Sequence, residues 1–390
     1  MPPTLPPPER RILLWYWGRR GAGGQMTLAL AEALAHQPGV KVALAISAQA
    51  ELRAEIEALG LPVEVLPTYA SAAGFVLGLL RLPWLAWRLR RQALAFRADA
   101  VVSVMTHLWT PLVAPVLRRS GLRYLPYIHD AEPHPGDPGW LWDWRLNTEL
   151  DAAIGAIALS ASVAAALRHR RPGLPVHRLV LGAHLPPALL DHPAPPRPAA
   201  GEAPLFLLFG RLRAYKGLDL LRDAWPLLRA HYPGATLLVV GEGDPEALAP
   251  GLAALPGVRV EARWLAEAEI PQLIAAADAV VLPYREASQS GVVALAHALG
   301  VPAVVTPMGG LAEQVRDGVD GAIAEAATPQ ALAAAMARLC PPAARATLAA
   351  GAAASGLALR DWGAQARGLL DILSTVTETG AAQAGDAGHG

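Results

Sequence analysis

Several kinds of chemically useful residue are scarce in this chain of 390 residues. It has one cysteine, Cys340, which excludes an intramolecular disulfide and a thiolate zinc cage and favours a reducing compartment. There is no Asp-x-Asp pair, and the 11 histidines lack zinc-type spacing, so we expect no bound metal. The 33 basic and 33 acidic residues cancel, which removes any whole-chain attraction to nucleic acid.

Lysine is rare among the basic residues. The chain has 31 arginines but only two lysines, Lys41 and Lys216. Charged residues make up 17% of the chain and hydrophobic residues 53%, which supplies material for a large core and excludes a disordered protein. A chain of this length favours two domains. The opening, MPPTLPPPERR, contains no apolar run, so we expect no secretory signal and a cytoplasmic protein.

One uncharged run is long enough to raise the question of a membrane span. Residues 100–117 contain eighteen residues without a formal charge, which meets the length requirement for a spanning helix. His107, Pro111 and Pro115 interrupt this run. We therefore predict a buried strand followed by a short helix here.

Apolar strands alternate with helical segments along both halves of the chain. The strand within 11–18 ends in a glycine-rich turn and enters a helical pattern, and the same opening recurs at 204–212. This alternation predicts parallel sheets covered on both faces. We predict an α/β chain of two Rossmann-like parallel-sheet domains facing a central cleft, because ligands of such folds bind at the carboxyl ends of the strands.

The predicted domain boundaries follow from changes in composition. The stretch before the second half is rich in proline and small residues, as linkers are, and the last residues lack periodicity. The predicted parts are a first domain at 1–185, a linker at 186–203, a second domain at 204–358, a helix at the domain junction at 359–373, and a disordered tail at 374–390.

Two cations follow the first strand of the second half. Arg211 and Lys216 precede a helix that begins beside Gly217, in FGRLRAYKGLDLL. Cations beside the positive end of a helix suit a diphosphate. Two solvated surface charges would give the same pattern. However, a chain that otherwise uses arginine has a lysine here, which favours a point-charge role.

A further anion site is indicated after the strand DAVVLPY. Ser288, Gln289, Ser290 and Gly291 lead into the helix VVALAHALG, whose first backbone N–H groups can bind an anion. Ser290 also fits an ordinary N-cap. Glu286 would repel a phosphate, so it suits neutral sugar hydroxyls, or it is a first-turn acid stabilised by the helix dipole.

In order and spacing, these elements resemble the family 4 (group 1) glycosyltransferases of GT-B fold. The pattern is G-R-x-x-x-x-K-G, V-G-x-G, P-Y-x-E-x-x-x-S-G and G-x-P with G-G-x-x-E, across roughly 205–325. The first half agrees more loosely, through its glycine-rich turn, the His-Asp pair that ends YLPYIHD, and Ser160. The segment HDAEPHPGD, together with EASQSG, is similar to a bacterial subgroup.

The resemblance implies transfer of a sugar from a nucleotide-diphosphate donor to an acceptor hydroxyl, with retention at the anomeric carbon. It implies no metal and no cofactor, since the nucleotide sugar is a substrate. Arg211 and Lys216 would hold the diphosphate and stabilise the leaving group, and Glu286 would bind sugar hydroxyls. His129 would line the reaction centre, although a histidine after a strand fits a structural role equally well. The implied donor-binding residues are Gly21, Gly23, Gly24, Gly210, Gly241, Glu242, Ser290, Gly291 and Val292.

Two departures from known patterns bear on this interpretation. The family's second glutamate, which usually contacts ribose, corresponds to Ala294, or to Leu295 if the frame shifts by one, so the ribose contact stays unassigned. A dinucleotide-binding oxidoreductase is disfavoured because Met26 stands at the third glycine position of G-x-G-x-x-G and no acid follows Ser47. No G-x-S-x-G hydrolase elbow is present.

The sequence indicates the acceptor-binding residues less clearly than the donor-binding ones. Residues 74–97 mix leucines, Trp84 and Trp87 with five arginines, as expected either of a helix on an anionic membrane surface or of a core helix with a solvated arginine edge. Residues 1–195 carry 19 basic and 14 acidic side chains, a balance of +5, and residues 196–390 carry the reverse, a balance of −5. A saccharide or lipid-linked acceptor in cell-envelope or exopolysaccharide synthesis is therefore expected to meet the first domain. A GT-B sugar-nucleotide epimerase and a degenerate, non-catalytic nucleotide-sugar-binding protein remain alternatives.

Overall fold

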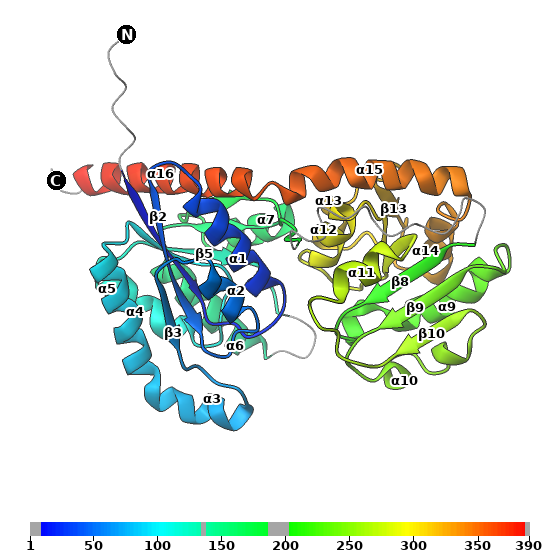
Figure 1. Ribbon diagram of the computed structural model, residues 1–390, viewed down its shortest axis with the longest axis horizontal. Coiled ribbons are helices and arrows are strands. Elements are labelled where there is room, and N and C mark those ends of the chain that lie inside the picture. Colours follow the sequence, from blue (N-terminus) through cyan, green and yellow to red (C-terminus); the bar gives the residue numbers. More distant parts are fainter. Residues whose placement is uncertain (1–8, 134–137, 186–202, 387–390) are drawn as a thin grey trace, which may run out of the picture. The chain divides into compact units, whose positions relative to one another are not determined.

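The computed structural model describes residues 9–133, 138–185 and 203–386, with side chains described as far as Val376. The chain divides into two compact units, one formed by Met1–Val180 with Asp361–Gly390 and the other by Leu181–Arg360. Figure 1 shows a sheet flanked by helices in each unit. The predicted pair of Rossmann-like parallel-sheet domains is confirmed. Most of the predicted linker, 186–202, lies outside the described residues.

The first unit is built on a seven-stranded sheet in the order β3-β2-β1-β4-β5-β6-β7, and every pairing is parallel. Leu14 in the central strand pairs with Leu44 on one side and Val102 on the other. The strands are β1 (Arg10–Tyr16), β2 (Val40–Ser47), β3 (Val63–Leu66), β4 (Ala100–Ser103), β5 (Tyr124–Ile128), β6 (Ala156–Ala158) and β7 (Val176–Arg178). The helices are α1 (Ala22–Ala35), α2 (Arg53–Ala58), α3 (Ala72–Gly78), η1 (Leu79–Arg81), α4 (Leu82–Phe96), α5 (Thr110–Arg119), α6 (Gly139–Ala152), α7 (Ala161–Arg170) and α16 (Trp362–Asp386).

The run at 100–117 forms the predicted strand and helix. β4 is fully buried in the sheet, and α5 begins at Thr110 with Pro111 in its first turn, where a missing N–H costs nothing. The interpretation of this run as a buried strand and a short helix, and not as a membrane span, is therefore confirmed.

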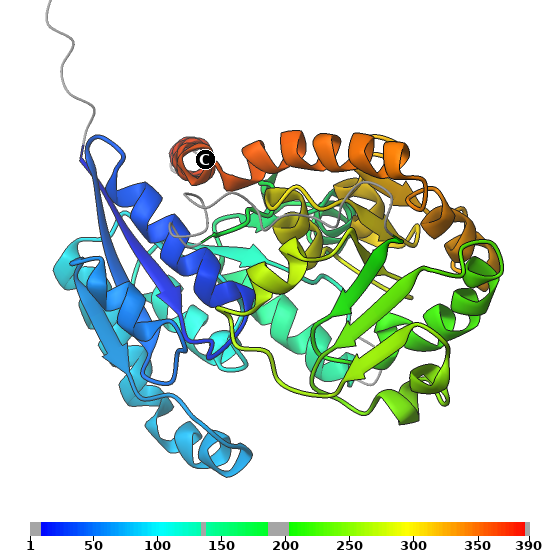
Figure 2. The same cartoon turned by 45° about the vertical axis from the view of Figure 1, so that its right-hand side comes forward.

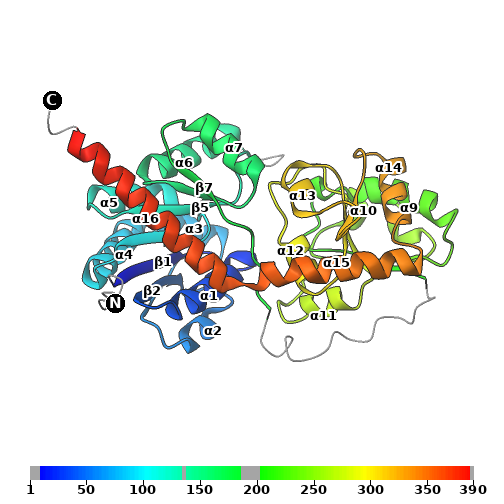
Figure 3. The same ribbon diagram turned by 90° about the horizontal axis from the view of Figure 1, so that it is seen from above.

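The last helix differs from its prediction. The helix expected at 359–373 runs from Trp362 to Asp386, so the expectation of a disordered tail is wrong for 374–386, while 387–390 lie outside the described residues. The helix belongs to the first unit, where it contacts α1 (Figure 3).

The second unit has a six-stranded parallel sheet in the order β10-β9-β8-β11-β12-β13. Leu207 in β8 pairs with Leu238 and with Val280, so β8 separates the two wings of the sheet. The strands are β8 (Leu205–Phe209), β9 (Thr236–Val240), β10 (Val258–Glu261), β11 (Ala279–Leu282), β12 (Ala303–Val305) and β13 (Gly321–Ile323). The helices are η2 (Ala214–Lys216), α9 (Leu218–Arg229), α10 (Pro245–Leu248), η3 (Leu252–Ala254), α11 (Ile270–Ala275), α12 (Gly291–Ala298), α13 (Gly309–Gln314), α14 (Pro329–Ala337) and α15 (Pro342–Arg360).

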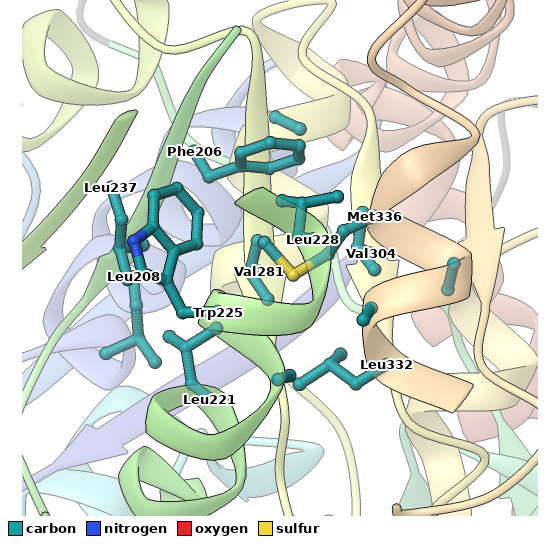
Figure 4. Packing of buried hydrophobic residues seen from close by; sticks show 14 of the residues in the cluster. Phe206, Leu208, Leu221, Trp225, Leu228, Leu237, Val281, Val304, Leu332 and Met336 are labelled. Atoms are coloured by element: carbon teal, nitrogen blue, oxygen red, sulfur yellow. The ribbon is translucent and has the colours of Figure 1, made fainter. Parts of the chain in front are cut away.

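The core of the second unit lies between its sheet and the helices α9 and α14. Figure 4 shows Trp225 and Leu228 of α9 packed toward Phe206, with Met336 of α14 on the other side. Trp225 is fully buried, and its indole N–H donates to the Pro256 carbonyl at 2.9 Å, which satisfies its polar atom. The amphipathic pattern of α9 therefore fixes this helix on the sheet directly after the loop that carries Lys216.

The single thiol also belongs to this unit. Cys340 is buried after α14, its Sγ lies 3.7 Å from the Met336 carbonyl oxygen, and burial raises its pKa to about 11. A thiol in these surroundings stays protonated and unreactive at neutral pH.

The first unit contains a buried polar chain within its apolar core. The Ser103 hydroxyl lies 2.8 Å from the Tyr124 hydroxyl, which donates to the Glu149 carboxylate at 2.6 Å. Glu149 is fully buried, and this burial raises its pKa to about 7, against the opposing effect of the Tyr124 hydrogen bond. The carboxyl is thus partly protonated at neutral pH.

We predict that Glu149 makes the stability of the protein depend on pH. Because its folded-state pKa lies above the ordinary 4.5, its contribution is complete below pH 4.5 and is lost as the pH rises through 7. The loss amounts to about 3 kcal/mol, at roughly 1.4 kcal/mol for each pH unit. Urea unfolding of Glu149→Gln should show a much flatter dependence of stability between pH 5 and 8 than the unaltered protein. The exposed Glu55→Gln serves as control, and parallel pH profiles for all three proteins would contradict the assignment.

Candidate functional site

The predicted donor residues of the second unit gather at the carboxyl ends of three neighbouring strands. Gly210, Arg211 and Lys216 follow β8, Gly241 and Glu242 follow β9, and Glu286 to Val292 follow β11. The strand order runs outward in opposite directions from β8, so this edge is the topological switch point at which α/β sheets bind ligands. The sheet therefore brings together motifs that lie up to about 80 residues apart.

Lys216 is the most unusual residue of this group. Its side chain is only 6% exposed, and no carboxylate among the described residues pairs with it. Its Nζ donates to the Tyr284 hydroxyl at 2.5 Å and lies 4.3 Å from the centre of the Tyr284 ring and 5.6 Å from that of Tyr215. Burial, together with a smaller effect of the positive charge of Arg211, lowers the pKa of Lys216 to about 8, against the opposing effect of Tyr215. A buried ammonium stabilised by phenol oxygens and rings alone is well suited to an incoming anion.

Glycines let the backbone close around this lysine. Gly217 has φ 66° and caps α9, and a Cβ there would overlap the Pro283 carbonyl oxygen. Gly210, with φ 108°, lies directly over the lysine, since a Cβ on it would be 3.5 Å from Nζ. Arg211 is exposed beside them. The glycines thus allow the loops after β8 and β11 to pack closely against each other.

The β9 loop is attached to the same place. A Cβ on Gly241 would overlap the Gly210 carbonyl oxygen, and the Glu242 carbonyl accepts a hydrogen bond from the Leu212 N–H at 2.8 Å. The Glu242 side chain is exposed. Gly241 and Glu242 therefore lie beside Gly210, as the motif spacing predicts.

The loop after β11 carries Glu286 and leads into α12. Ser290 is buried and caps α12, because its Oγ accepts the Val292 N–H at 3.2 Å. Its backbone is held by Gln314, whose Oε1 accepts the Ser290 N–H at 2.7 Å and whose Nε2 donates to the Ser290 carbonyl at 3.0 Å. Glu286 and Gly291 are exposed. The N-cap interpretation of Ser290 is therefore correct, and the serine also orients the start of the helix.

The positions of the missing second glutamate offer no substitute. Ala294 and Leu295 both lie in α12 and are buried, at 2% and 8% exposure. An apolar pair in the helix interior has no group that could hydrogen-bond a ribose hydroxyl. The helix α12 thus has no carboxylate at either position where the second glutamate was expected.

In the first unit, His129 follows β5 and is half-buried. Its Nε2 lies 3.0 Å from the Val104 carbonyl oxygen, which identifies Nε2 as the protonated nitrogen of the neutral ring. Burial lowers the pKa of His129, and the Val104 carbonyl and the neighbouring Asp130 charge oppose that shift. The side chain is therefore held at the carboxyl ends of β4 and β5.

The glycine-rich turn of the first unit is shorter than expected. Gly21 caps α1 with φ 85°, whereas Gly23 and Gly24 are buried inside the first turn of that helix and not in a loop. A Cβ on Gly23 would meet the Tyr16 ring and the Met105 sulfur. Only Gly21 of the three thus occupies the loop, and the other two permit close packing of α1.

Two residues of the site were not assigned from the sequence. Tyr284 was visible within the P-Y-x-E pattern, but nothing in the pattern shows that its hydroxyl binds Lys216. Gln314 directly follows the G-G-x-x-E pattern, and no signal marks it as the residue that holds Ser290. Among the described residues, no group of three or more His, Cys, Asp and Glu side chains is placed to hold a metal ion.

Known proteins resemble this chain in sequence and in fold. Residues 203–341 match the family model described as Glycosyl transferases group 1. A GDP-mannose-dependent alpha-(1-6)-phosphatidylinositol monomannoside mannosyltransferase from Mycolicibacterium smegmatis is 29% identical over 289 residues, which cover 67% of this chain and 73% of that protein. A D-inositol 3-phosphate glycosyltransferase from Segniliparus rotundus is 35% identical over 170 residues, 41% of this chain and 37% of that protein.

Solved structures extend the likeness to nearly the whole chain. HepE from Anabaena, in complex with UDP, superposes with a TM-score of 0.70 at 20% identity, covering 94% of this chain and 100% of that one. Sucrose-phosphate synthase from Thermosynechococcus elongatus gives 0.72 at 19% identity, covering 95% and 100%. The two Rossmann-like units therefore have the fold of these structures, the GT-B fold. The match to the group 1 glycosyltransferase model lies within the second of these units, at residues 203–341.

We predict that replacing Lys216 by methionine, which keeps the buried volume and removes the charge, lowers turnover more than about tenfold, because a charge-assisted contact to the leaving group is lost. The apparent affinity for the donor should also weaken as the pH rises above about 8, where Lys216 loses its proton. Initial rates at pH 6.5–9.5 test both effects. Lys41→Met is the matched control, since Lys41 is exposed and pairs with Glu9. Normal activity in folded Lys216→Met would refute the role.

Proposed function

We propose that this glycosyltransferase moves a sugar from a nucleotide-diphosphate sugar to a hydroxyl of a saccharide or lipid-linked acceptor, with retention of anomeric configuration, in cell-envelope or exopolysaccharide synthesis. The bond between the anomeric carbon and the diphosphate breaks, and the acceptor oxygen forms the new bond on the same face. The acceptor proton leaves with the nucleoside diphosphate. Neither a metal nor a cofactor takes part.

The buried Lys216 ammonium is the observation that carries this proposal. A diphosphate that leaves the sugar gains negative charge, and Lys216 with Arg211 would stabilise that charge at a site that is already shielded from water. The backbone N–H groups at the start of α12 would add donors, with Gly291 and Val292 close to the phosphate. Gly210, Gly241 and Glu242 would shape the surrounding loop.

The remaining assigned residues would serve the sugar. Glu286, exposed at the end of β11, would accept hydrogen bonds from donor-sugar hydroxyls. His129 would line the reaction centre from the first unit, where its neutral ring is oriented by the Val104 carbonyl. Gly21 would let the turn before α1 approach the sugar phosphate, with Gly23 and Gly24 behind it.

Known neighbours support the choice of donor class. HepE was solved with UDP-glucose, and the mycobacterial relative is named for its dependence on GDP-mannose. Both donors are nucleotide-diphosphate sugars. The same mycobacterial name gives a phosphatidylinositol monomannoside as the acceptor, which supports a lipid-linked or saccharide acceptor for this chain.

We further propose a cytoplasmic protein that binds peripherally to the inner face of an anionic membrane through residues 72–96. By length and composition this continuous helix is apolar enough to cross a membrane, with 28% of its most apolar window buried. Leu85, Leu89 and Ala93 pack in the core of the first unit, which supports surface contact over insertion. Leu77 and Leu80 are 66% and 83% exposed, on the part of the helix that extends away from the sheet (Figure 2).

The charges on this helix refine the expected lipid contacts. Arg88 pairs with Glu64 at 2.5 Å, and Arg90 donates to the Ser120 hydroxyl at 2.6 Å, so both are held by the protein. Arg91 is exposed and lies 5.0 Å from the Trp87 ring centre, and Arg81 is exposed nearer the tip. Arg81 and Arg91 are therefore the arginines that would meet lipid headgroups in the proposed contact.

Acceptor-dependent release of nucleoside diphosphate tests the proposed reaction. A thermal-shift panel of UDP, GDP, ADP and their sugars first identifies the donor, because a ligand that binds the folded state raises the melting temperature. We expect nucleoside diphosphate release to rise when a cell-envelope extract is added, to persist in excess chelator, and to give a product whose anomeric configuration by NMR equals that of the donor. Turnover of the nucleotide sugar without acceptor would indicate the epimerase, and binding without turnover the degenerate protein.

Liposome flotation tests the membrane contact. We expect the protein to float with vesicles that contain phosphatidylglycerol, more weakly with phosphatidylcholine alone, and scarcely at all after Leu77→Glu with Leu80→Glu. Arg81→Glu with Arg91→Glu should weaken binding to anionic vesicles by at least roughly thirtyfold, at about 1 kcal/mol for each basic residue near the surface. Leu357→Glu, at another exposed leucine, is the control. Equal flotation of all variants would overturn the contact.

A further inference from the structure

Tyr284 is the side chain that holds the buried ammonium of Lys216. Its hydroxyl accepts a hydrogen bond from Lys216 Nζ at 2.5 Å, and its ring centre lies 4.3 Å from the same nitrogen. Tyr284 is 4% exposed and Lys216 is 6% exposed, so the contact is largely shielded from water. A shielded hydrogen bond to a charged group is stronger than one at the surface. The Tyr284 hydroxyl therefore fixes the position of the ammonium.

The same ammonium keeps two N–H donors for a ligand. An ammonium group has three donors, and within the described part of the chain the Tyr284 hydroxyl is the one acceptor that Lys216 Nζ reaches. Two N–H groups that share one positive charge suit two oxygens of a diphosphate. The contact with Tyr284 thus orients the ammonium while leaving most of its donors available.

The neutral phenol suits this task better than an acid would. Burial raises the pKa of Tyr284, and a hydrogen bond with the Ser290 side chain opposes that shift, so the phenol stays protonated at neutral pH. A carboxylate in its place would also hold Lys216, but its negative charge would repel a diphosphate. The phenol oxygen therefore supplies an acceptor without cancelling the charge that the site needs.

The backbone around Tyr284 is fixed to the elements that carry Lys216. The Thr306 hydroxyl donates to the Tyr284 carbonyl at 2.5 Å, and the Arg285 N–H donates to the Tyr215 carbonyl at 2.7 Å. The Arg285 side chain also pairs with Asp219 of α9 at 2.5 Å. These contacts join the loop after β11 to η2 and to the first turn of α9. The phenol is thereby held opposite the lysine.

The other charges near Lys216 do not replace this contact. Burial lowers the pKa of Lys216 to about 8, and of the smaller effects Tyr215 raises it and Arg211 lowers it. The Arg285 charge is balanced by Asp219. A hydrogen bond to the protonated form favours that form, so loss of the Tyr284 hydroxyl should lower the pKa of Lys216 further.

We propose that Tyr284 is a positioning residue of the diphosphate site, whose hydroxyl keeps the Lys216 ammonium charged and oriented so that its two remaining N–H donors meet the leaving group. As a contribution to catalysis, this role rests on the proposed transfer from a nucleotide-diphosphate sugar. The hold of Tyr284 on Lys216 does not depend on that reaction.

NMR of the full chain with lysine labelled at ¹³Cε tests this hold directly, because Lys41 and Lys216 are the only lysines. The Cε shift of each lysine follows its protonation as the pH is raised. We expect Tyr284→Phe, which keeps the ring and removes the hydroxyl, to lower the pKa of Lys216 by about one unit or more, as loss of a hydrogen bond to a charged group does. Tyr232→Phe, at a half-buried tyrosine after α9, should leave it unchanged. The exposed Lys41 serves as reference in every spectrum.

Initial rates connect the hold on Lys216 to the reaction. With the donor and acceptor identified, the alkaline limb of kcat/KM should move from about pH 8 in the unaltered protein to about pH 7 in Tyr284→Phe. At pH 8 the protonated fraction of Lys216 would fall from about one half to about one tenth, so kcat/KM should fall about fivefold. Tyr232→Phe should keep the original profile. A variant that merely contained less folded protein would lose the same share of its rate at every pH.

The outcomes separate the role of Tyr284 from the proposed reaction. Equal pKa values of Lys216 in folded Tyr284→Phe and in the unaltered protein overturn the role, whether or not sugar transfer occurs. A lowered pKa supports the hold on Lys216 even if no transfer is found, whereas a lowered pKa with an unmoved rate profile overturns the positioning role. If Tyr284→Phe does not fold, proton exchange of the Lys216 ammonium in the unaltered protein decides. Exchange with water much slower than that of Lys41 supports the hydrogen bond, and equally fast exchange overturns it.

Discussion

The buried charge of Lys216 is the constraint around which the second unit is arranged. An ammonium removed from water, with no carboxylate paired to it among the residues that the structure describes, is costly, and it persists here because Tyr284 accepts a hydrogen bond and two phenol rings face it. The loops after β8, β9 and β11 close around it through backbone contacts that only glycine permits at positions 217 and 241, and Gly210 has a positive φ of 108° that favours glycine. The positive charge is thereby preorganised, so that binding an anion requires little rearrangement.

Most of the fold could be read from the sequence because its signals are periodic and repeated. Apolar strands alternating with helices, twice over, specify two parallel sheets, and the glycine-flanked Arg211 and Lys216 mark the switch point of the second. The prediction for the end of the chain was wrong, since the stretch after 373 lacks an amphipathic pattern, yet α16 continues to Asp386.

The hydrogen-bond partners of the site residues could not be predicted from the sequence. That Tyr284 binds Lys216, or that Gln314 holds Ser290, depends on how loops from different strands meet, and no local pattern encodes such a meeting. The same holds for Gly23 and Gly24, which fit a binding loop by composition but lie within α1 because its first turn packs tightly on Tyr16 and Met105. Residue types were therefore predictable, whereas their contacts required the tertiary structure.

The uneven use of the two basic residues has a structural counterpart. In the first unit, arginines lie over aromatic faces, as in Arg19 on Tyr69, Arg88 on Trp84, Arg91 on Trp87 and Arg145 on Trp142. A planar guanidinium can stack flat on a ring and keep its in-plane donors for other contacts, whereas an ammonium meets a ring only as a compact charge. The lysine of the second unit instead serves as a compact charge in a small buried space. Arginine and lysine thus have different tasks in the two units.

The surroundings of Cys340 make the chain convenient for spectroscopy. Its thiol is buried and stays protonated, so reagents that modify thiolates at neutral pH have no reactive target in the native protein. A cysteine introduced at an exposed position on each unit would then be labelled selectively, without first removing a native one. A pair of spin labels or fluorophores placed in this way would follow the distance between the two units as donor is added.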